Sequence, residues 1–149
     1  MSLEFKTGNL FSYAADGYAH GCNCQGVMGA GIALEFRDRY PEMFAEYRKR
    51  CRDGSFNLGS CFAWKAPSGQ MIYNLGTQIR PGRYATLESV EVALTTMLRI
   101  SGMNNPPGHL IAIPRIGCGL GGLNWNDVRL VIERVVAGQN HTDVVVISQ

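Results

Sequence analysis

Two glycine clusters, each lying between an apolar run and a helical pattern, constrain the fold of this chain more than any other feature. The first spans residues 26–31 (GVMGAG) and the second spans residues 117–122 (GCGLGG). A strand-to-helix junction presents backbone N–H groups without intrahelical partners, and the helix dipole adds a partial positive charge, so such a junction favours anions. Either loop alone is also compatible with a simple tight connection. Two of them at one edge of a single sheet predict a site for two phosphates.

Apolar runs that alternate with helical patterns predict the fold class. Strands are expected at residues 3–6, 18–22, 61–64, 71–74, 109–113 and 144–147. Helices are expected at residues 31–39, from Pro41 to Arg50, from the N-cap Thr86 to a stop at Gly102, and after the N-cap Asn124. This alternation predicts a three-layer α/β/α sandwich with a mixed central sheet. The length predicts one domain over residues 1–149.

The charge balance and the cysteines limit the classes of partner and compartment. A formal net charge of +2 gives no reason to expect strong nonspecific binding to nucleic acid. The five cysteines have no repeated spacing, the first residues given lack the charged and apolar regions typical of a signal peptide, and no run of eighteen apolar residues occurs. We therefore expect a cytoplasmic protein without a membrane partner. Cys22 and Cys24 with His20 lack the spacing of a zinc site, so no metal is expected.

Two familiar nucleotide-binding motifs do not account for the glycine clusters. The second cluster partly matches the G-x-G-x-x-G fingerprint of dinucleotide-binding folds, which belongs on the first strand of a nucleotide-binding half. Only 28 residues follow Gly121, and they hold one expected helix and one expected strand. A Walker loop requires a Lys-Ser/Thr pair, which neither cluster contains.

Polar side chains are expected at the ends of three strands. Asn9 follows the first expected strand, and Asn23 and Gln25 follow the second. Asn74 and Thr77 end the fourth. Open α/β sheets bind ligands at the carboxyl ends of their strands, so these side chains are candidates to surround a ligand. Each of them is also compatible with a buried amide or hydroxyl that caps a turn.

The motifs, taken in order along the chain, resemble those of macrodomains. The resemblance rests on GNLF at residues 8–11, HGCNCQG at 20–26, MGAGIA at 28–33, YNLGTQ at 73–78 and IPRIGCGLGGLNW at 113–125. Within that family the chain is most similar to three groups. These are the terminal ADP-ribose protein glycohydrolases, the macrodomain antitoxins that remove ADP-ribose from DNA, and the yeast-type ADP-ribose-1″-phosphate phosphatases. The resemblance runs from the first expected strand to the last.

This resemblance implies a site for ADP-ribose and no cofactor. Asn9 is expected to face the adenine amino group, with the Leu10 amide at the ring and Asn23 at the distal ribose. Many family members have Asp at the first of these positions, and the Asn carbonyl oxygen accepts the same hydrogen bond without a charge. The residues expected to bind ADP-ribose are Gly8, Asn9, Leu10, Asn23, Gln25, Met28, Gly29, Ala30, Gly31, Ile32, Thr77, Gln78, Ile116, Gly117, Cys118, Gly119, Leu120 and Gly121.

The resemblance also implies a hydrolase, although two groups used by related enzymes are missing. The glycohydrolases and the DNA-directed antitoxins use a lysine directly after the threonine of the fourth motif, where this chain has Gln78. An amide cannot replace the amine as a nucleophile. The Asp that protein glycohydrolases use in the second phosphate loop aligns with Gly121. His20 and Asn23 are the expected catalytic residues, His20 as a general base that matches a histidine of the yeast-type phosphatases. A structural histidine inside the strand end is the alternative.

Two functions stay open. A hydrolase would process an ADP-ribosylated macromolecule, O-acetyl-ADP-ribose or ADP-ribose-1″-phosphate by positioning substrate and an ordered water. A reader would bind ADP-ribose without turnover. Of these two functions we expect the hydrolase. Its expected partner is ADP-ribose or an ADP-ribosylated substrate. Nucleic acid is expected as a partner only where it is ADP-ribosylated.

Three further residues near the expected site have an open role. Arg80 and Arg83 lie in a Pro-Gly loop and are either solvent-exposed or able to receive a terminal phosphate or the modified macromolecule. Cys118 is expected to have a lowered thiol pKa at a helix N-terminus, and to offer its N–H group to a phosphate.

Overall fold

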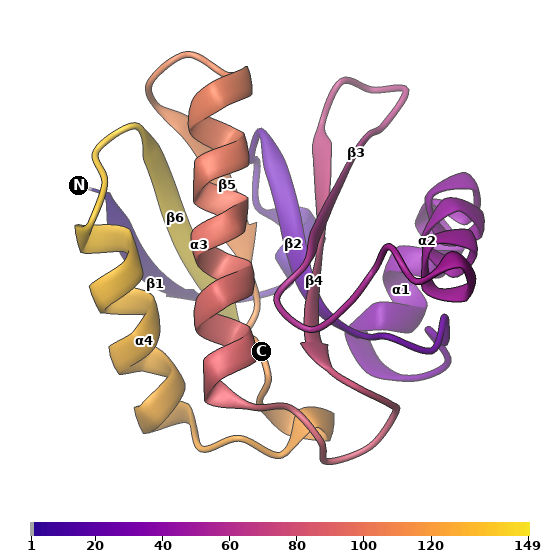
Figure 1. Cartoon of the computed structure of the whole chain (residues 1–149). Helices are drawn as coiled ribbons and strands as arrows, with labels where there is room; N and C mark the ends of the chain where they lie inside the picture. Colours follow the sequence, from indigo (N-terminus) through magenta and orange to yellow (C-terminus); the bar gives the residue numbers. More distant parts are fainter. Residues whose placement is uncertain (1) are drawn as a thin grey trace.

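A computed structural model describes residues 2–149 and shows one six-stranded sheet with helices on both faces (Figure 1). The strands lie in the order β1-β6-β5-β2-β4-β3 across the sheet. Their bounds are β1 Leu3–Thr7, β2 Gly17–Asn23, β3 Cys61–Lys65, β4 Met71–Gln78, β5 His109–Ile113 and β6 Thr142–Ser148. Neighbouring strands pair in parallel, except that β3 is antiparallel to β4. The carboxyl ends of five strands therefore meet at one edge, and the predicted mixed sheet is confirmed.

The helices form the two outer layers of the predicted α/β/α sandwich. Their bounds are α1 Gly31–Arg39, α2 Pro41–Asp53, α3 Leu87–Asn104 and α4 Trp125–Ala137, and two 3-10 turns are η1 Leu10–Ser12 and η2 Gly119–Gly121. In Figure 1, α3 and α4 lie in front of the sheet, while α1 and α2 pack against its other face. Within residues 2–149, no helix combines the length and the apolar character that crossing a membrane requires.

The central strands supply side chains to both helical layers in alternation. In β6, Val144 and Val146 belong to the core beneath α3 and α4, whereas Val145 and Ile147 belong to the core beneath α1 and α2. Successive side chains of a strand point to opposite faces of a sheet, so a strand covered on both sides needs a continuous apolar run. This explains why the sequence of β6 is apolar throughout its centre.

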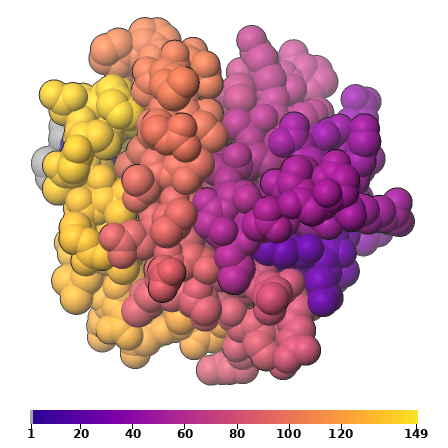
Figure 2. Space-filling view, in the orientation of Figure 1, coloured from indigo at the N-terminus to yellow at the C-terminus, as the bar shows by residue number. Residues whose placement is uncertain are grey.

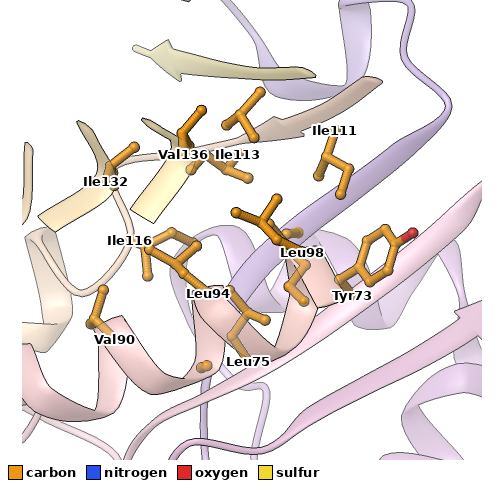
Figure 3. Packing of buried hydrophobic residues seen from close by; sticks show 14 of the residues in the cluster. Tyr73, Leu75, Val90, Leu94, Leu98, Ile111, Ile113, Ile116, Ile132 and Val136 are labelled. Carbon is orange, nitrogen blue, oxygen red and sulfur yellow. The ribbon is translucent and has the colours of Figure 1, made fainter. Parts of the chain in front are cut away.

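One stripe of α3 provides much of the larger core. Val90, Leu94 and Leu98 recur every four residues and point towards the sheet, as Figure 3 shows. The strand residues in this core include Tyr73 and Leu75 of β4 and Ile111 and Ile113 of β5. The helix begins as predicted, because the Thr86 Oγ1 accepts the Ser89 backbone N–H at 3.2 Å.

Helices α2 and α3 and strand β4 extend beyond their predicted ends, α2 to Asp53 instead of Arg50. Helix α3 continues past Gly102 to Asn104, and Gly102 does not have a positive φ. A Cβ at Gly102 would lie 2.6 Å from the His141 ring, so the glycine allows close approach rather than ending the helix. Strand β4 continues to Gln78, which places Asn74 in the middle of a buried strand rather than at its end.

The sheet contains a switch point between β2 and β5. These strands are parallel neighbours, and β2 leads to α1 on one face of the sheet while β5 leads to α4 on the other. Because the two connections turn away from each other, a crevice opens outside the carboxyl ends of this strand pair. The two glycine clusters are the segments that border the crevice.

Candidate functional site

A cleft lies at this switch point and consists of three adjoining cavities. Their volumes are about 630, 290 and 170 Å³, and we call them the wide end, the middle and the narrow end. Ile32 and Arg115 line both the wide end and the middle. Gln78 and Leu120 line both the middle and the narrow end. The cleft is therefore continuous along its length.

Both glycine loops present free backbone N–H groups to the middle of the cleft. One set lies at the start of α1 and the other lies between β5 and η2. The residues concerned are Gly31, Ile32, Ala33, Gly117, Gly119 and Leu120. Among residues 2–149, none of these N–H groups donates a hydrogen bond to another protein group. The middle of the cleft is thus lined by unsatisfied donors on both sides, which is the environment that an anion requires.

Glycine is needed at two positions that bring the loops together. Gly31 has a φ of +60°, and a Cβ there would lie 3.2 Å from the Leu120 side chain of the opposite loop. Gly117 has a φ of +77°, and its carbonyl accepts the Leu123 N–H at 3.0 Å, which closes the second loop on itself. A residue with a side chain is strained at either backbone conformation.

Asn23 and Tyr47 hold the first glycine loop in shape. The Asn23 Oδ1 accepts the N–H groups of Gln25 and Val27 at 3.0 and 3.3 Å, and its Nδ2 donates to the Val27 carbonyl at 2.7 Å. The fully buried Tyr47 of α2 donates its hydroxyl to the Asn23 carbonyl at 2.7 Å. Asn23 lines the narrow end, and its Oδ1 is occupied within the loop, whereas one of the two Nδ2 hydrogens has no partner within residues 2–149.

The wide end contains the charged side chains of the cleft. Among the described residues that line the three cavities, these are Glu35 and Arg115. The Arg115 Nε donates to the Ser148 Oγ at 2.9 Å, and its guanidinium lies 4.6 Å from the centre of the Trp125 ring. Sequence reasoning missed Glu35, Arg115 and Trp125 as site residues. Arg115 lies two residues after a predicted strand, and this position would have indicated it as a site residue.

Asn9 lies beside the wide end without lining it. Its Oδ1 accepts the Phe11 N–H at 2.9 Å, so the side chain caps η1. The next residue, Leu10, is buried and lines the wide end.

Gln78 fixes the rim of the narrow end. Its Nε2 donates to the carbonyls of Arg80 and Gly82 at 2.8 and 2.7 Å. Within residues 2–149 its Oε1 receives no hydrogen bond. Gln78 therefore keeps a free acceptor oxygen while its donor nitrogen holds the loop that follows β4.

His20 lies behind the cleft rather than in it. It is fully buried, its Nε2 donates to the Asn74 Oδ1 at 2.7 Å, and its ring stacks on Phe36 at 3.8 Å between centroids. Burial lowers the pKa of His20 to about 4, and the hydrogen bond to Asn74 offsets only part of this. A general-base role conflicts with this position, because the imidazole has no path to a ligand in the cleft.

Cys118 corrects two further expectations. Partial burial raises the pKa of its thiol. The lowering expected at a helix N-terminus does not occur, because the residue precedes a three-residue turn rather than an α-helix. Its backbone N–H donates to the Arg115 carbonyl at 3.1 Å and is not available to a phosphate.

Most residues expected at the site lie together along the cleft. Those lining it are Leu10, Asn23, Gly29, Ala30, Gly31, Ile32, Thr77, Gln78, Ile116, Gly117, Cys118, Gly119, Leu120 and Gly121. Gly8, Asn9 and Gln25 are exposed nearby, and Met28 is buried beneath the first loop. The described residues 2–149 contain no group of three or more metal-ligating side chains.

Comparison with known proteins identifies relatives with the same fold. The sequence pattern of the Macro domain matches residues 19–132. A DNA ADP-ribosyl glycohydrolase of Mycobacterium tuberculosis is 34% identical over 131 residues, which cover 85% of this chain and 36% of the relative. An ADP-ribose 1″-phosphate phosphatase of Meyerozyma guilliermondii is 24% identical, with 89% and 93% coverage. The solved macrodomain of Mycobacterium tuberculosis DarG superposes with a TM-score of 0.86 at 30% identity, covering 97% and 96% of the two chains.

The match covers only part of the mycobacterial enzyme. This chain spans little more than a third of the relative's length. The resemblance therefore concerns one domain of a longer protein.

The burial of His20 predicts a pH-dependent stability. An unfolded histidine titrates near ~6.5, whereas folded His20 titrates at about 4, so the unfolded chain binds more protons between these values. The free energy of unfolding should fall by up to about 3 kcal/mol as the pH decreases from 6.5 to 4. Urea unfolding of wild type and His20→Gln across this range checks the prediction.

In His20→Gln, the free energy of unfolding should depend much less steeply on pH than in wild type. His109, whose pKa burial lowers, and Asp53, whose pKa the hydrogen bonds from Ser55 lower, contribute to the remaining dependence in both proteins. Equal slopes in the two proteins would show that His20 is not the group that titrates.

The Tyr47 hydroxyl should be needed to order the first glycine loop. Tyr47→Phe removes the bond to the Asn23 carbonyl and should lower the free energy of unfolding by about 1–2 kcal/mol. Hydrogen exchange of the amides of residues 24–29 should become faster. Tyr84→Phe, which changes a half-exposed ring, is the matched control and should alter neither quantity. Unchanged exchange in Tyr47→Phe would contradict the bracing role.

Proposed function

Because this chain belongs to the Macro domain family, we propose that it binds ADP-ribose in the cleft and hydrolyses a bond at the distal ribose of ADP-ribosyl compounds. One observation carries the proposal. Two sets of free backbone N–H groups face each other across the middle of the cleft, and a diphosphate supplies oxygen acceptors to both sets at once.

The groups that line the middle of the cleft suit a diphosphate rather than a cationic or neutral ligand. Its donors are main-chain amides, and the dipole of α1 adds positive potential at its first turn. Arg115 lines both the middle and the wide end and supplies one full positive charge. In our proposal its guanidinium attracts the phosphate nearer the adenosine.

The sizes of the two ends set the direction of the ligand. Adenosine is larger than ribose, so we assign it to the wide end of about 630 Å³ and the distal ribose to the narrow end of about 170 Å³. Leu10 and Trp125 then offer apolar contact to the nucleoside. The Asn9 Oδ1 accepts one backbone N–H and keeps a second lone pair for the adenine amino group.

A water molecule is the nucleophile in this proposal. The position of the lysine used by related glycohydrolases holds Gln78, whose carboxamide cannot attack a sugar carbon. Gln78 lines both the middle and the narrow end of the cleft, and we assign its free Oε1 to orient the attacking water. Cleavage of a glycosidic bond passes through a positively charged sugar, which this oxygen and the bound diphosphate stabilise.

Similarity to enzymes supports hydrolysis over binding alone. The relatives described above are named as a DNA ADP-ribosyl glycohydrolase and an ADP-ribose 1″-phosphate phosphatase, and both names describe hydrolysis of ADP-ribosyl compounds. The second candidate function is a reader that binds ADP-ribose without turnover. The presence of Gln78 in place of a nucleophile favours it.

Binding should depend on both phosphates and on space at the narrow end. Calorimetry should give a micromolar Kd for ADP-ribose, about −8 kcal/mol, and a much weaker one for AMP. Gly29 lacks a positive φ, and a Cβ there would make only an ordinary contact with Val27 at 3.7 Å, so Gly29→Val should fold normally, occupy the narrow end and weaken binding at least about tenfold. Gly138→Val, outside the cleft, is the control. AMP binding as tight as that of ADP-ribose would refute the assignment.

Turnover should proceed without a covalent intermediate. We expect hydrolysis of at least one compound among ADP-ribosylated DNA, ADP-ribosylated protein and ADP-ribose-1″-phosphate, with no sugar–protein adduct trapped by borohydride. Gln78→Lys tests whether the scaffold accepts the nucleophile of its relatives. If wild type binds ADP-ribose and hydrolyses no compound of the panel, the reader function is correct.

A further inference from the structure

The wide end of the cleft is lined by two charged side chains, Glu35 of α1 and Arg115, and the function proposed above gives no role to Glu35. We propose that Glu35 determines specificity for the nucleoside. It admits an adenosine whose ribose hydroxyls are free and excludes one that carries a phosphate on that ribose. The protein therefore takes ADP-ribosyl groups that derive from NAD and rejects those that derive from NADP. This inference rests on the proposed function, which assigns adenosine to the wide end.

Packing on α1 fixes the position of Glu35. Ile32, about one turn earlier, also lines the wide end, and the next residue, Phe36, is fully buried. Residues three and four apart share a face of a helix, so Glu35 continues the stripe that faces the cavity. η1 packs beside this stripe, because the Phe11 ring centre lies 4.8 Å from that of Phe36. Figure 2, seen from the direction of Figure 1, shows α3 and α4 over the front of the sheet, so Glu35 belongs to the opposite layer.

The negative charge of Glu35 has no cationic partner within the protein. Among residues 2–149, its carboxylate forms no ion pair. The two arginines that follow it on α1 lie over aromatic rings instead. The Arg37 guanidinium is 5.2 Å from the centre of the Phe44 ring, and that of Arg39 is 4.1 Å from the centre of the Phe11 ring. The carboxylate therefore remains available to act on a ligand in the wide end.

Arg115 does not cancel this charge at the nucleoside. Its Nε donates to the Ser148 Oγ at 2.9 Å, and its guanidinium lies over the Trp125 ring at 4.6 Å. Arg115 also lines the middle of the cleft, whereas Glu35 lines only the wide end. The positive charge thus lies on the side of the diphosphate and the negative charge on the side of the nucleoside.

The ligand preference follows from the chemistry of a carboxylate. A carboxylate accepts hydrogen bonds and donates none, and adenosine offers it the amino group and the ribose hydroxyls as donors. A phosphate on a ribose hydroxyl replaces a donor by an anion, which a partly buried carboxylate repels. Repulsion of this kind discriminates because it acts on the wrong ligand alone. Dinucleotide-binding folds use the same chemistry, with an acidic side chain at the ribose of NAD and an arginine where the ligand carries a 2′-phosphate.

Calorimetry with two ligands tests the proposal independently of turnover. The ligands are ADP-ribose and ADP-ribose that carries a phosphate on the 2′-hydroxyl of its adenosine. Wild type should bind the phosphorylated ligand at least about tenfold more weakly than ADP-ribose. Glu35→Gln keeps one acceptor oxygen and removes the charge. It should bind ADP-ribose about threefold more weakly than wild type and the phosphorylated ligand about threefold more tightly. Glu35→Lys should prefer the phosphorylated ligand. A purely structural role of Glu35 would weaken both ligands alike.

Asp38→Asn is the matched control, because Asp38 is exposed on the same helix, about one turn further on, and lines none of the three cavities of the cleft. It should leave the ratio of the two Kd values unchanged. Failure of wild type to bind either ligand would refute the proposed function. If wild type binds ADP-ribose but binds the phosphorylated ligand as tightly or more tightly, the inference about Glu35 alone is wrong. Discrimination that persists in Glu35→Gln, or that Asp38→Asn reduces equally, would also overturn it.

Discussion

The parallel pairing of β2 with β5, followed by helices on opposite faces of the sheet, is the constraint on which the cleft depends. The chain leaves β2 towards α1 and leaves β5 towards α4, so neither connection fills the space outside this strand pair. Both connections must turn sharply at the same edge, and their N–H groups point into the space between them. The glycines and the free amides follow from this topology.

Free amides in a cleft are costly unless a ligand or water satisfies them, and the protein holds them in place by contacts outside the cleft. Asn23 at the end of β2 and Tyr47 of α2 brace the first loop, and the bond between Leu123 and Gly117 closes the second. A site braced in this way loses little conformational freedom on binding. It also couples ligand binding to stability, because a ligand bound only by the folded state stabilises that state.

The sequence predicted the parts of the molecule that follow from local pattern. Apolar runs located all six strands, and the glycine clusters located the middle of the cleft. Prediction from the sequence failed where long-range packing decides whether a side chain is buried or accessible. Asn74 looked like a strand end because amides are common there, but β4 is covered on both faces and the Asn74 amide is satisfied by His20 and the Phe62 carbonyl. His20 itself looked accessible because its partner Phe36 is distant in sequence from β2.

Gln78 combines two roles that a carboxamide allows, holding a loop and presenting an acceptor. A lysine at this position has donors and no acceptor, whereas a carboxamide has both. In the structure the donor nitrogen of Gln78 holds the carbonyls of Arg80 and Gly82, and its oxygen receives no hydrogen bond within residues 2–149. In the proposed function, an amide at this position replaces a covalent intermediate by a positioned water, and the two hydrogen bonds of its nitrogen fix the side chain that positions that water.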